Sequence, residues 1–168
     1  KPLFEDAFAR IWAGEVENDG FNKLVPGAGL AWRQVVVLRA YCKFLRQAAI
    51  PFSQAYMEET LAANPALARM IVELFETLFD PAGQDTAAAR CKRLRRRIKQ
   101  ALDAVAVLDE DRILRRYVNV VESTLRTNFY QAGAHGGAKP YVSFKLDSQA
   151  VIELPLPRPL PLPLPLPL

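Results

Sequence analysis

The spacing of hydrophobic residues is the feature that most restricts the fold of this 168-residue chain. Over most of the first 130 residues, hydrophobic side chains recur three and four positions apart, as in helices that bury one face. From Tyr141 the period changes to two, because Val142, Phe144 and Leu146 alternate with polar residues, as in a half-buried strand. The sequence therefore predicts a mainly α fold, bundle-like, with a short C-terminal β ribbon.

Two long helices form the centre of this prediction, over residues 85–108 and 109–130. The connection between them is short and acidic, which favours an antiparallel hairpin. We expect their apolar stripes to face each other or a shared core. The stripes are Leu94, Ile98, Leu102 and Val105 on the first helix, and Leu114, Tyr117, Val121 and Leu125 on the second. Shorter helices are expected over residues 3–12, 30–49, 53–63 and 64–78.

Glycine-rich residues 133–137 interrupt the helical pattern, and strands are predicted at residues 141–147 and 151–154. We divide the chain into a helical domain (1–131), a flexible linker (132–139), a pair of strands (140–156) and a Pro-Leu tail (157–168). The tail favours an extended polyproline-like form, and we expect it to be an artefact of cloning or of how the sequence was cut. Since the chain begins at Lys1, we expect it to be a piece of a longer protein.

Composition excludes several classes of protein. Two cysteines, Cys42 and Cys91, exclude a disulfide-rich scaffold and favour the reducing cytoplasm. No apolar run approaches the ~18 residues of a membrane helix, so we expect no membrane partner. His135 is the only histidine, and we interpret it as a loop residue because metal sites need several ligands. No phosphate-binding loop, dinucleotide fingerprint or metalloprotease motif is present.

One decapeptide holds the positive charge. Residues 90–99 read RCKRLRRRIK, with seven basic residues and no acidic one. The whole chain has a net charge of +4, so the remainder has a net charge of −3. At helical spacing, the basic side chains project away from Leu94 and Ile98. The candidate partner-binding residues are Lys92, Arg93, Arg96, Arg97 and Lys99.

Two interpretations of this basic face differ in the partner. A nucleic acid or an acidic protein could bind it through charge. A solvated helix face, or a docking surface for an acidic part of a parent protein, is favoured because no aromatic or glycine-rich element accompanies the run, as RNA and single-strand binders would use. We therefore expect no nucleic acid partner. Residues 18–25, NDGFNKLV, are interpreted as a loop that packs through Phe21 and Leu24.

Several stretches together resemble the large bacterial NAD-specific glutamate dehydrogenases. ENDGFNKLV at 17–25, WRQV at 32–35 and VELFE at 72–76 carry part of the resemblance. The strongest part runs from residue 112 to 131 and then through KPYVSFKLDS at 139–148 into VIELPLPRP at 151–159. The resemblance covers residues 1–160, and the Pro-Leu repeat departs from it.

The resemblance implies a place for this chain in a larger enzyme. It corresponds to the helical region between a long regulatory part and the catalytic core, and its strands would be the first of the glutamate-binding domain. The parent would oxidise L-glutamate to 2-oxoglutarate and ammonia with NAD, in the cytoplasm and as a homo-oligomer. No catalytic, NAD-binding or metal-binding residue carries over to this chain, so we expect a structural, interdomain or assembly role and no activity of the chain alone.

Overall fold

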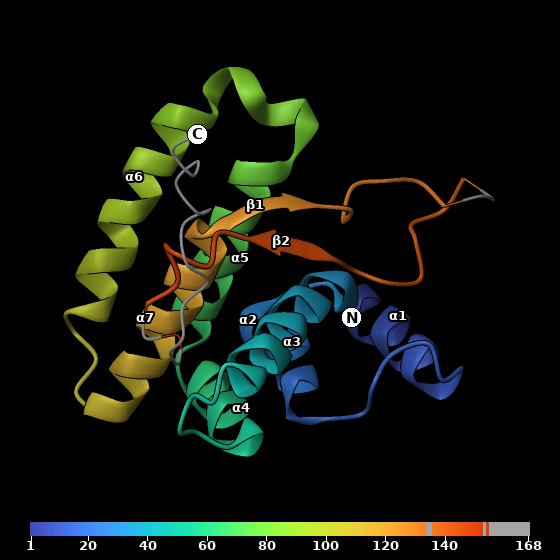
Figure 1. Ribbon diagram of the computed structural model, residues 1–168. Helices are drawn as coiled ribbons and strands as arrows, with labels where there is room; N and C mark the ends of the chain where they lie inside the picture. Colours follow the sequence, from blue (N-terminus) through green and yellow to red (C-terminus); the bar gives the residue numbers. More distant parts are fainter. Residues whose placement is uncertain (134–135, 153, 155–168) are drawn as a thin grey trace, which may run out of the picture.

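The computed structural model describes residues 1–133, 136–152 and 154. Within them the chain forms seven α-helices and two strands (Figure 1). The helices are α1 (Pro2–Trp12), α2 (Leu24–Ala28), α3 (Trp32–Gln47), α4 (Gln54–Ala63), α5 (Pro65–Phe79), α6 (Gln84–Leu102) and α7 (Leu108–Glu122). The strands are β1 (Thr124–Thr127) and β2 (Phe144–Leu146), and 3-10 turns η1 (Gly20–Lys23) and η2 (Pro81–Gly83) precede α2 and α6. The prediction of a mainly α fold with a short β ribbon is confirmed.

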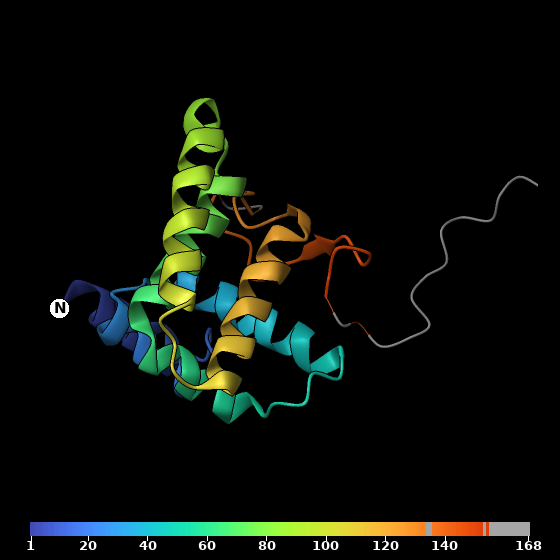
Figure 2. The ribbon, with the colours of Figure 1, turned by 90° about the vertical axis from the view of Figure 1, so that its left-hand side faces the viewer.

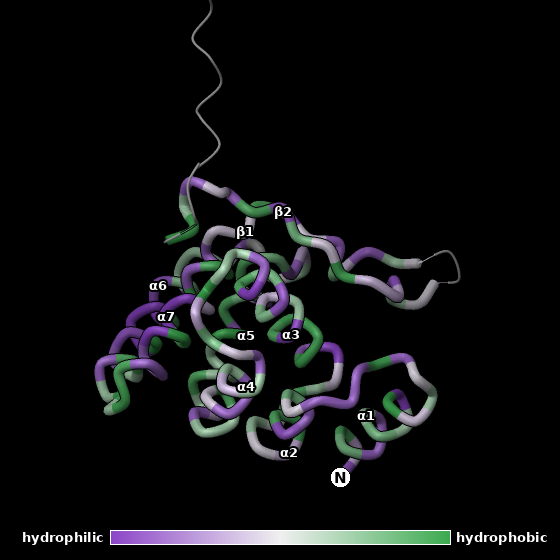
Figure 3. Tube along the Cα trace, turned by 60° about the horizontal axis from the view of Figure 1, so that its bottom comes forward, coloured by the Kyte–Doolittle hydropathy of each residue, from purple (hydrophilic) through white to green (hydrophobic). Residues whose placement is uncertain are grey.

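Helix α5 is the centre of the core and packs against α2, α3, α4, α6 and α7. Pro65 begins it, at a position where the missing N–H costs no hydrogen bond. Ile71, Leu74 and Phe75 are fully buried. Helix α1 lies at one end of the molecule, while α6 and α7 lie at the other (Figures 1 and 3).

An aromatic cluster fixes the ribbon to the helices. The ring of Phe144 on β2 stacks on Tyr41 of α3 at 4.5 Å between centroids, and meets the ring of Phe75 edge-on at 5.9 Å. Phe129, just after β1, approaches Phe75 edge-on at 5.2 Å. A two-stranded ribbon is marginal in water by itself, so these contacts supply the packing that it needs.

The helix predicted over 109–130 ends sooner, and that prediction is wrong. Helix α7 stops at Glu122, and β1 follows at once, antiparallel to β2. Thr124 marks the change: its hydroxyl donates to the carbonyl of Val120 and accepts a 2.8 Å hydrogen bond from the buried hydroxyl of Tyr41. Pairing with β2 therefore overrides a helical pattern that the local sequence carries as far as Leu125.

The strand predicted at 151–154 is also wrong for the residues described there. The backbone turns at Asp147, whose carbonyl accepts from the amides of Ala150 and Val151. Asn119 on α7 then binds both sides of the turn, donating to the carbonyl of Ala150 and accepting from the amide of Ile152. Val151 is buried against the helices instead of pairing in the ribbon, and the partner of β2 is β1.

The two long helices run antiparallel and are joined by a short connection (Figures 1 and 2). Of the two predicted arrangements, the stripes face a shared core more than each other, because α6 packs most extensively against α5 and only slightly against α7. Leu94, Ile98 and Leu102 are buried, as expected. Leu125, which was assigned to the second stripe, is 53% exposed on β1.

The segment at residues 18–25 is an ordered part of the core. The carboxylate of Asp19 accepts a hydrogen bond from the amide of Phe21 and so caps the start of η1. Helix α2 follows and is capped at its C-terminal end by Gly29, whose φ of 63° is a conformation that favours glycine. Phe21 and Leu24 are fully buried, which confirms the prediction that this segment packs. The prediction that it is a loop is wrong, because η1 and the start of α2 occupy most of it.

Candidate functional site

The basic decapeptide lies along the outer face of α6. Cys91, Leu94 and Ile98 point into the core and are 2–4% exposed. The side chains between them are exposed, as the helical spacing predicted: Lys92, Arg93, Arg96, Arg97 and Lys99. Figure 3 shows the strongly hydrophilic colouring that results along α6. We call these five residues the α6 basic face.

The positive charge of the α6 basic face is not neutralised by the part of the chain that the structure describes. Only the neighbouring Arg95 is paired there, with Nε 2.5 Å from Oε1 of Glu122 on α7. None of the five face residues makes an ion pair or a side-chain hydrogen bond with a described residue. An unpaired cluster of cations attracts anionic surfaces. The role of the face in binding remains a prediction.

A second exposed surface lies at the other end of the molecule, on α1. Phe4 and Phe8 are each 56% exposed, and Trp12 is 84% exposed. Their rings stack in a row, with centroids 6.4 Å and 6.2 Å apart, while Ala7 faces the core. Contiguous exposed aromatic surface of this kind is typical of interaction sites. We call these three residues the α1 aromatic stripe.

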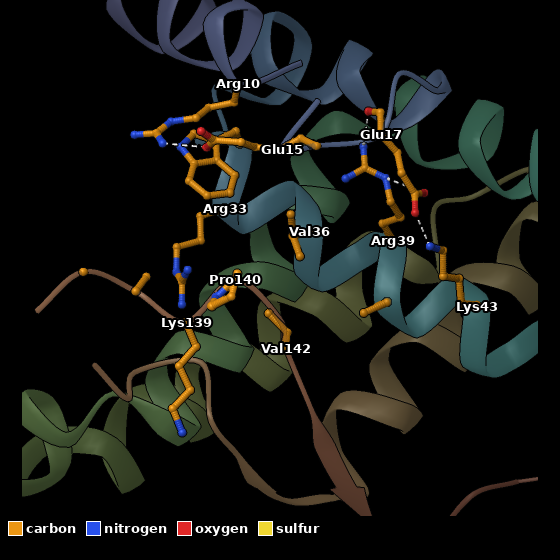
Figure 4. A pocket seen from close by; sticks show the side chains of 15 residues that line it. Arg10, Glu15, Glu17, Arg33, Val36, Arg39, Lys43, Lys139, Pro140 and Val142 are labelled. Atoms are coloured by element: carbon orange, nitrogen blue, oxygen red, sulfur yellow. Dashed lines mark hydrogen bonds and ion pairs between the residues drawn. The ribbon is translucent and has the colours of Figure 1, made fainter. Parts of the chain in front are cut away.

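A groove of about 640 Å³ lies where α1, α3 and residues 137–142 meet (Figure 4). Trp32, Val36 and Val142 form its apolar part. Most of its cations are paired with carboxylates: Arg10 with Glu15 at 2.7 Å, Lys43 with Glu17, and Arg39 with Asp19 at 2.6 Å. These pairs connect α1 and the following loop to α3, and they leave little charge for a ligand.

Arg33 and Lys139 line this groove without a carboxylate partner among the described residues, and Arg33 has a structural role. One of its terminal nitrogens donates to the carbonyl of Phe129 at 2.6 Å, and its guanidinium stacks over the Phe129 ring at 4.6 Å. Burial lowers the pKa of Arg33 from its ordinary value. The residue thus fixes the end of the β1 segment against α3. The described residues that line the groove include no histidine, serine or cysteine that could act as nucleophile or base.

The other candidates from the sequence do not form a reactive site. His135 lies outside the described residues. Cys42 is fully buried, and burial raises its pKa to about 11, so it is held as a thiol. Cys91 is 4% exposed on the inner side of α6. Among the described residues no three His, Cys, Asp or Glu side chains are grouped as a metal would require, and no described helix is long and apolar enough to cross a membrane.

Sequence reasoning missed a cationic pair on the ribbon. Arg126 on β1 lies directly opposite Lys145 on β2. Neither residue belongs to a charge run, and they are separated by 19 positions, so no local pattern marks them. The only available signal was the strand pattern around Lys145, and the partner strand was predicted to be helix.

Comparison with known proteins identifies the family. Residues 16–81 match the family model of glutamate dehydrogenase, helical motif 3, and residues 97–161 match that of the bacterial NAD-glutamate dehydrogenase catalytic domain. The second match begins within α6. The two matched segments together cover most of the chain.

Curated relatives agree with these models. The chain is 45% identical over 152 residues to an NAD-specific glutamate dehydrogenase of Halomonas elongata, covering 90% of this chain and 9% of that protein. It is 46% identical to proteins of the same name from Pseudomonas aeruginosa and Mycobacterium tuberculosis, over 91% and 90% of this chain and 10% of each relative. The chain thus spans about a tenth of the length of the curated relatives it matches. It belongs to the family of bacterial NAD-specific glutamate dehydrogenases.

Proposed function

We propose that this chain is a non-catalytic helical segment of an NAD-dependent glutamate dehydrogenase and that it contacts other parts of that enzyme. The observation that carries the proposal is the α6 basic face, which is exposed and unpaired among the described residues. The α1 aromatic stripe, at the opposite end, supports it. Two surfaces of different chemistry at the two ends suit a segment held between neighbouring domains or subunits.

The reaction of the whole enzyme is inferred from the family. NAD-specific glutamate dehydrogenases deaminate L-glutamate oxidatively to 2-oxoglutarate and ammonia, and NAD accepts the hydride. The residues present here do not fit an NAD site, because a dinucleotide is held where a glycine-rich turn joins a strand to a helix. Gly29 precedes α3 but follows α2, so no strand leads into that turn. We therefore infer that NAD binds elsewhere in the enzyme.

An activity assay of the purified chain tests the first part of the proposal. With glutamate and NAD present, we expect no NADH above the rate of a heat-treated sample. Reproducible turnover that stays with the chain through successive purification steps would show that it holds a catalytic site, and would contradict the proposal.

Charge reversal in a full-length relative tests the contact role. Changing the residues equivalent to Arg93, Arg96 and Arg97 to Glu should disturb assembly or regulation, measured by light scattering after size exclusion, and leave the turnover of correctly assembled enzyme unchanged. The same change at the equivalent of exposed Lys23, on η1, is the matched control and should do neither. A large loss of turnover in assembled enzyme would mean that the face reaches the active site.

A nucleic acid partner for the same face is the alternative function, and one titration separates it. Duplex DNA and heparin are titrated against the chain at about 50 mM and 200 mM salt, because neutralised phosphates make binding strongly salt-dependent. Absence of binding at the lower salt is the expected result. Tight low-salt binding with a steep negative salt slope would favour the alternative and count against an interdomain contact.

A further inference from the structure

The outer face of the β ribbon carries cations that repel each other. Arg126 and Lys145 are both exposed and stand directly opposite in the antiparallel pair. Like charges in this arrangement destabilise a sheet. Neither side chain makes an ion pair or a hydrogen bond with a described residue. The cations of the α6 basic face are distributed along a helix, whereas Arg126 and Lys145 are paired residues on neighbouring strands.

A β-bulge creates this arrangement. The register shifts between Thr124 and Arg126, so that Leu125 is the extra residue. Strict alternation would turn residue 126 to the inner face, like the buried Thr124. With the bulge, Leu125 and Arg126 are both exposed, and Arg126 meets Lys145. Bulges are found where a strand re-aims a side chain, frequently next to a functional site.

The cations line a groove of about 660 Å³ on this face, within the size range of small-molecule sites. Lys139 contributes a third cation, with Nζ 2.7 Å from Oε1 of Gln131 and 5.9 Å from the centre of the Tyr141 ring. Among the described residues that line it there is no aspartate or glutamate. The groove near α1 differs in this respect, because there most cations have a carboxylate partner.

Neutral donors accompany the cations. Thr127, Ser143 and Tyr130 also line the groove. Burial, followed by the carboxylates of Glu76 and Asp80, raises the pKa of Tyr130 to about 12, so its hydroxyl remains protonated and able to donate. Three cations with hydroxyl donors, and no carboxylate among the described lining residues, suit an oxyanion, since an anion reduces the repulsion between the cations and accepts their hydrogen bonds. The carboxylates of Glu76 and Asp80 act on Tyr130 from outside this lining.

We propose that the outer face of the ribbon is a binding site for a small oxyanion of the phosphate or carboxylate type, held between Arg126 and Lys145 with Lys139 at its edge. The site is separate from the α6 basic face and does not depend on it. The inner face of the ribbon, stacked through Phe144 on Tyr41, keeps the two cations in register.

An NMR titration of the whole chain tests this site. Inorganic phosphate and malonate are added separately, with sodium chloride at matched ionic strength as the reference. We expect saturable shifts of the backbone amides of Arg126, Thr127 and Lys145 that chloride does not produce. Saturation by phosphate alone assigns the site to phosphates, and saturation by malonate alone assigns it to carboxylates. Shifts no larger than those with chloride would overturn the proposal.

Substitutions connect the binding to the two cations. Lys145→Gln should weaken binding at least tenfold, while Arg96→Gln, on the α6 basic face, should leave it unchanged. Lys145→Glu should abolish binding and also raise the thermal midpoint at low salt, because it places opposite charges across the ribbon. Equal affinity in the wild type and Lys145→Gln, or a lower midpoint for a folded Lys145→Glu, would contradict the assignment.

Discussion

Arg39 of α3 and Asp19, twenty residues earlier, form a bidentate ion pair within the protein. Nε of Arg39 lies 2.6 Å from Oδ2 of Asp19, and a terminal nitrogen lies 2.8 Å from Oδ1. The side chains are only 5% and 14% exposed. The pair holds the loop before η1 against α3, and the guanidinium also lies over the ring of Phe21 at 5.7 Å.

Removing the acid of this pair should be costly. Asp19→Ala leaves the buried guanidinium with only the more distant and more exposed carboxylate of Glu17, 3.7 Å from Nε. We therefore expect the free energy of unfolding to fall by about 3 kcal/mol in urea denaturation. Glu15→Ala, which removes the exposed partner of Arg10, is the control and should leave the unfolding midpoint near that of the wild type. Equal effects of the two changes would show that burial of the Arg39 pair is unimportant.

The orientation of α6 gives a second prediction. Ile98→Ala should lower the free energy of unfolding by about 2–5 kcal/mol, because Ile98 is 2% exposed and its loss leaves a cavity. Arg96→Ala, on the outer face, should change it by less than about 0.5 kcal/mol. Urea melts of both variants give the comparison. A larger loss for Arg96→Ala would require α6 to be rotated from the observed position.

The hydroxyl pair between Tyr41 and Thr124 should behave as a coupled unit. Thr124→Val leaves the buried phenol without an acceptor, and should cost about 1–3 kcal/mol. Adding Tyr41→Phe removes the hydroxyl that lacks an acceptor. The double variant should therefore lose less stability than the sum of the losses in the two single variants. A double-mutant cycle by thermal or urea unfolding measures the coupling. Strict additivity would mean that the bond does not stabilise the fold.

Alkaline pH should weaken the fold through Cys42. Burial raises its pKa to about 11, so between the pKa of an unfolded thiol and that value the native state binds more protons than the unfolded state. The stability is fully present below the unfolded pKa and is lost as pH rises towards 11. Each pH unit should remove up to about 1.4 kcal/mol.

Urea denaturation at pH 8, 9 and 10 measures this slope, and Cys42→Ala should flatten it whatever its effect at neutral pH. A variant with the same slope as the wild type would assign the alkaline loss to other groups.

Local signals in the sequence located the helices well. Ser53 caps α4 by accepting from the amide of Tyr56, and Pro65 begins α5, because capping and proline effects act within a few residues. The outer position of Arg96 and the inner position of Ile98 also follow from helical spacing. The α6 basic face could therefore be predicted from the sequence. The partner that it binds could not, because helical spacing carries no information about a partner.

The errors lie where residues distant in sequence decide the structure. Thr124 is in a strand and not in the predicted helix because it pairs with β2 and is hydrogen-bonded to the hydroxyl of Tyr41. Val151 leaves the strand pattern because Asn119 binds the turn beside it. The meeting of Arg126 with Lys145 depends on a bulge, for which the sequence offers no local sign. These sites are set by tertiary pairing, which single-sequence periodicity does not contain.

Helix α6 packs on α5 across the boundary between the two segments that match family models. The segment that resembles the helical motif ends at residue 81, and the segment that resembles the catalytic domain begins at residue 97. Leu94, Ile98 and Leu102 bury that junction in one hydrophobic cluster with Phe75 and Phe144. The two segments should thus unfold in one cooperative transition, and neither could be transplanted alone without exposing half of a shared interior.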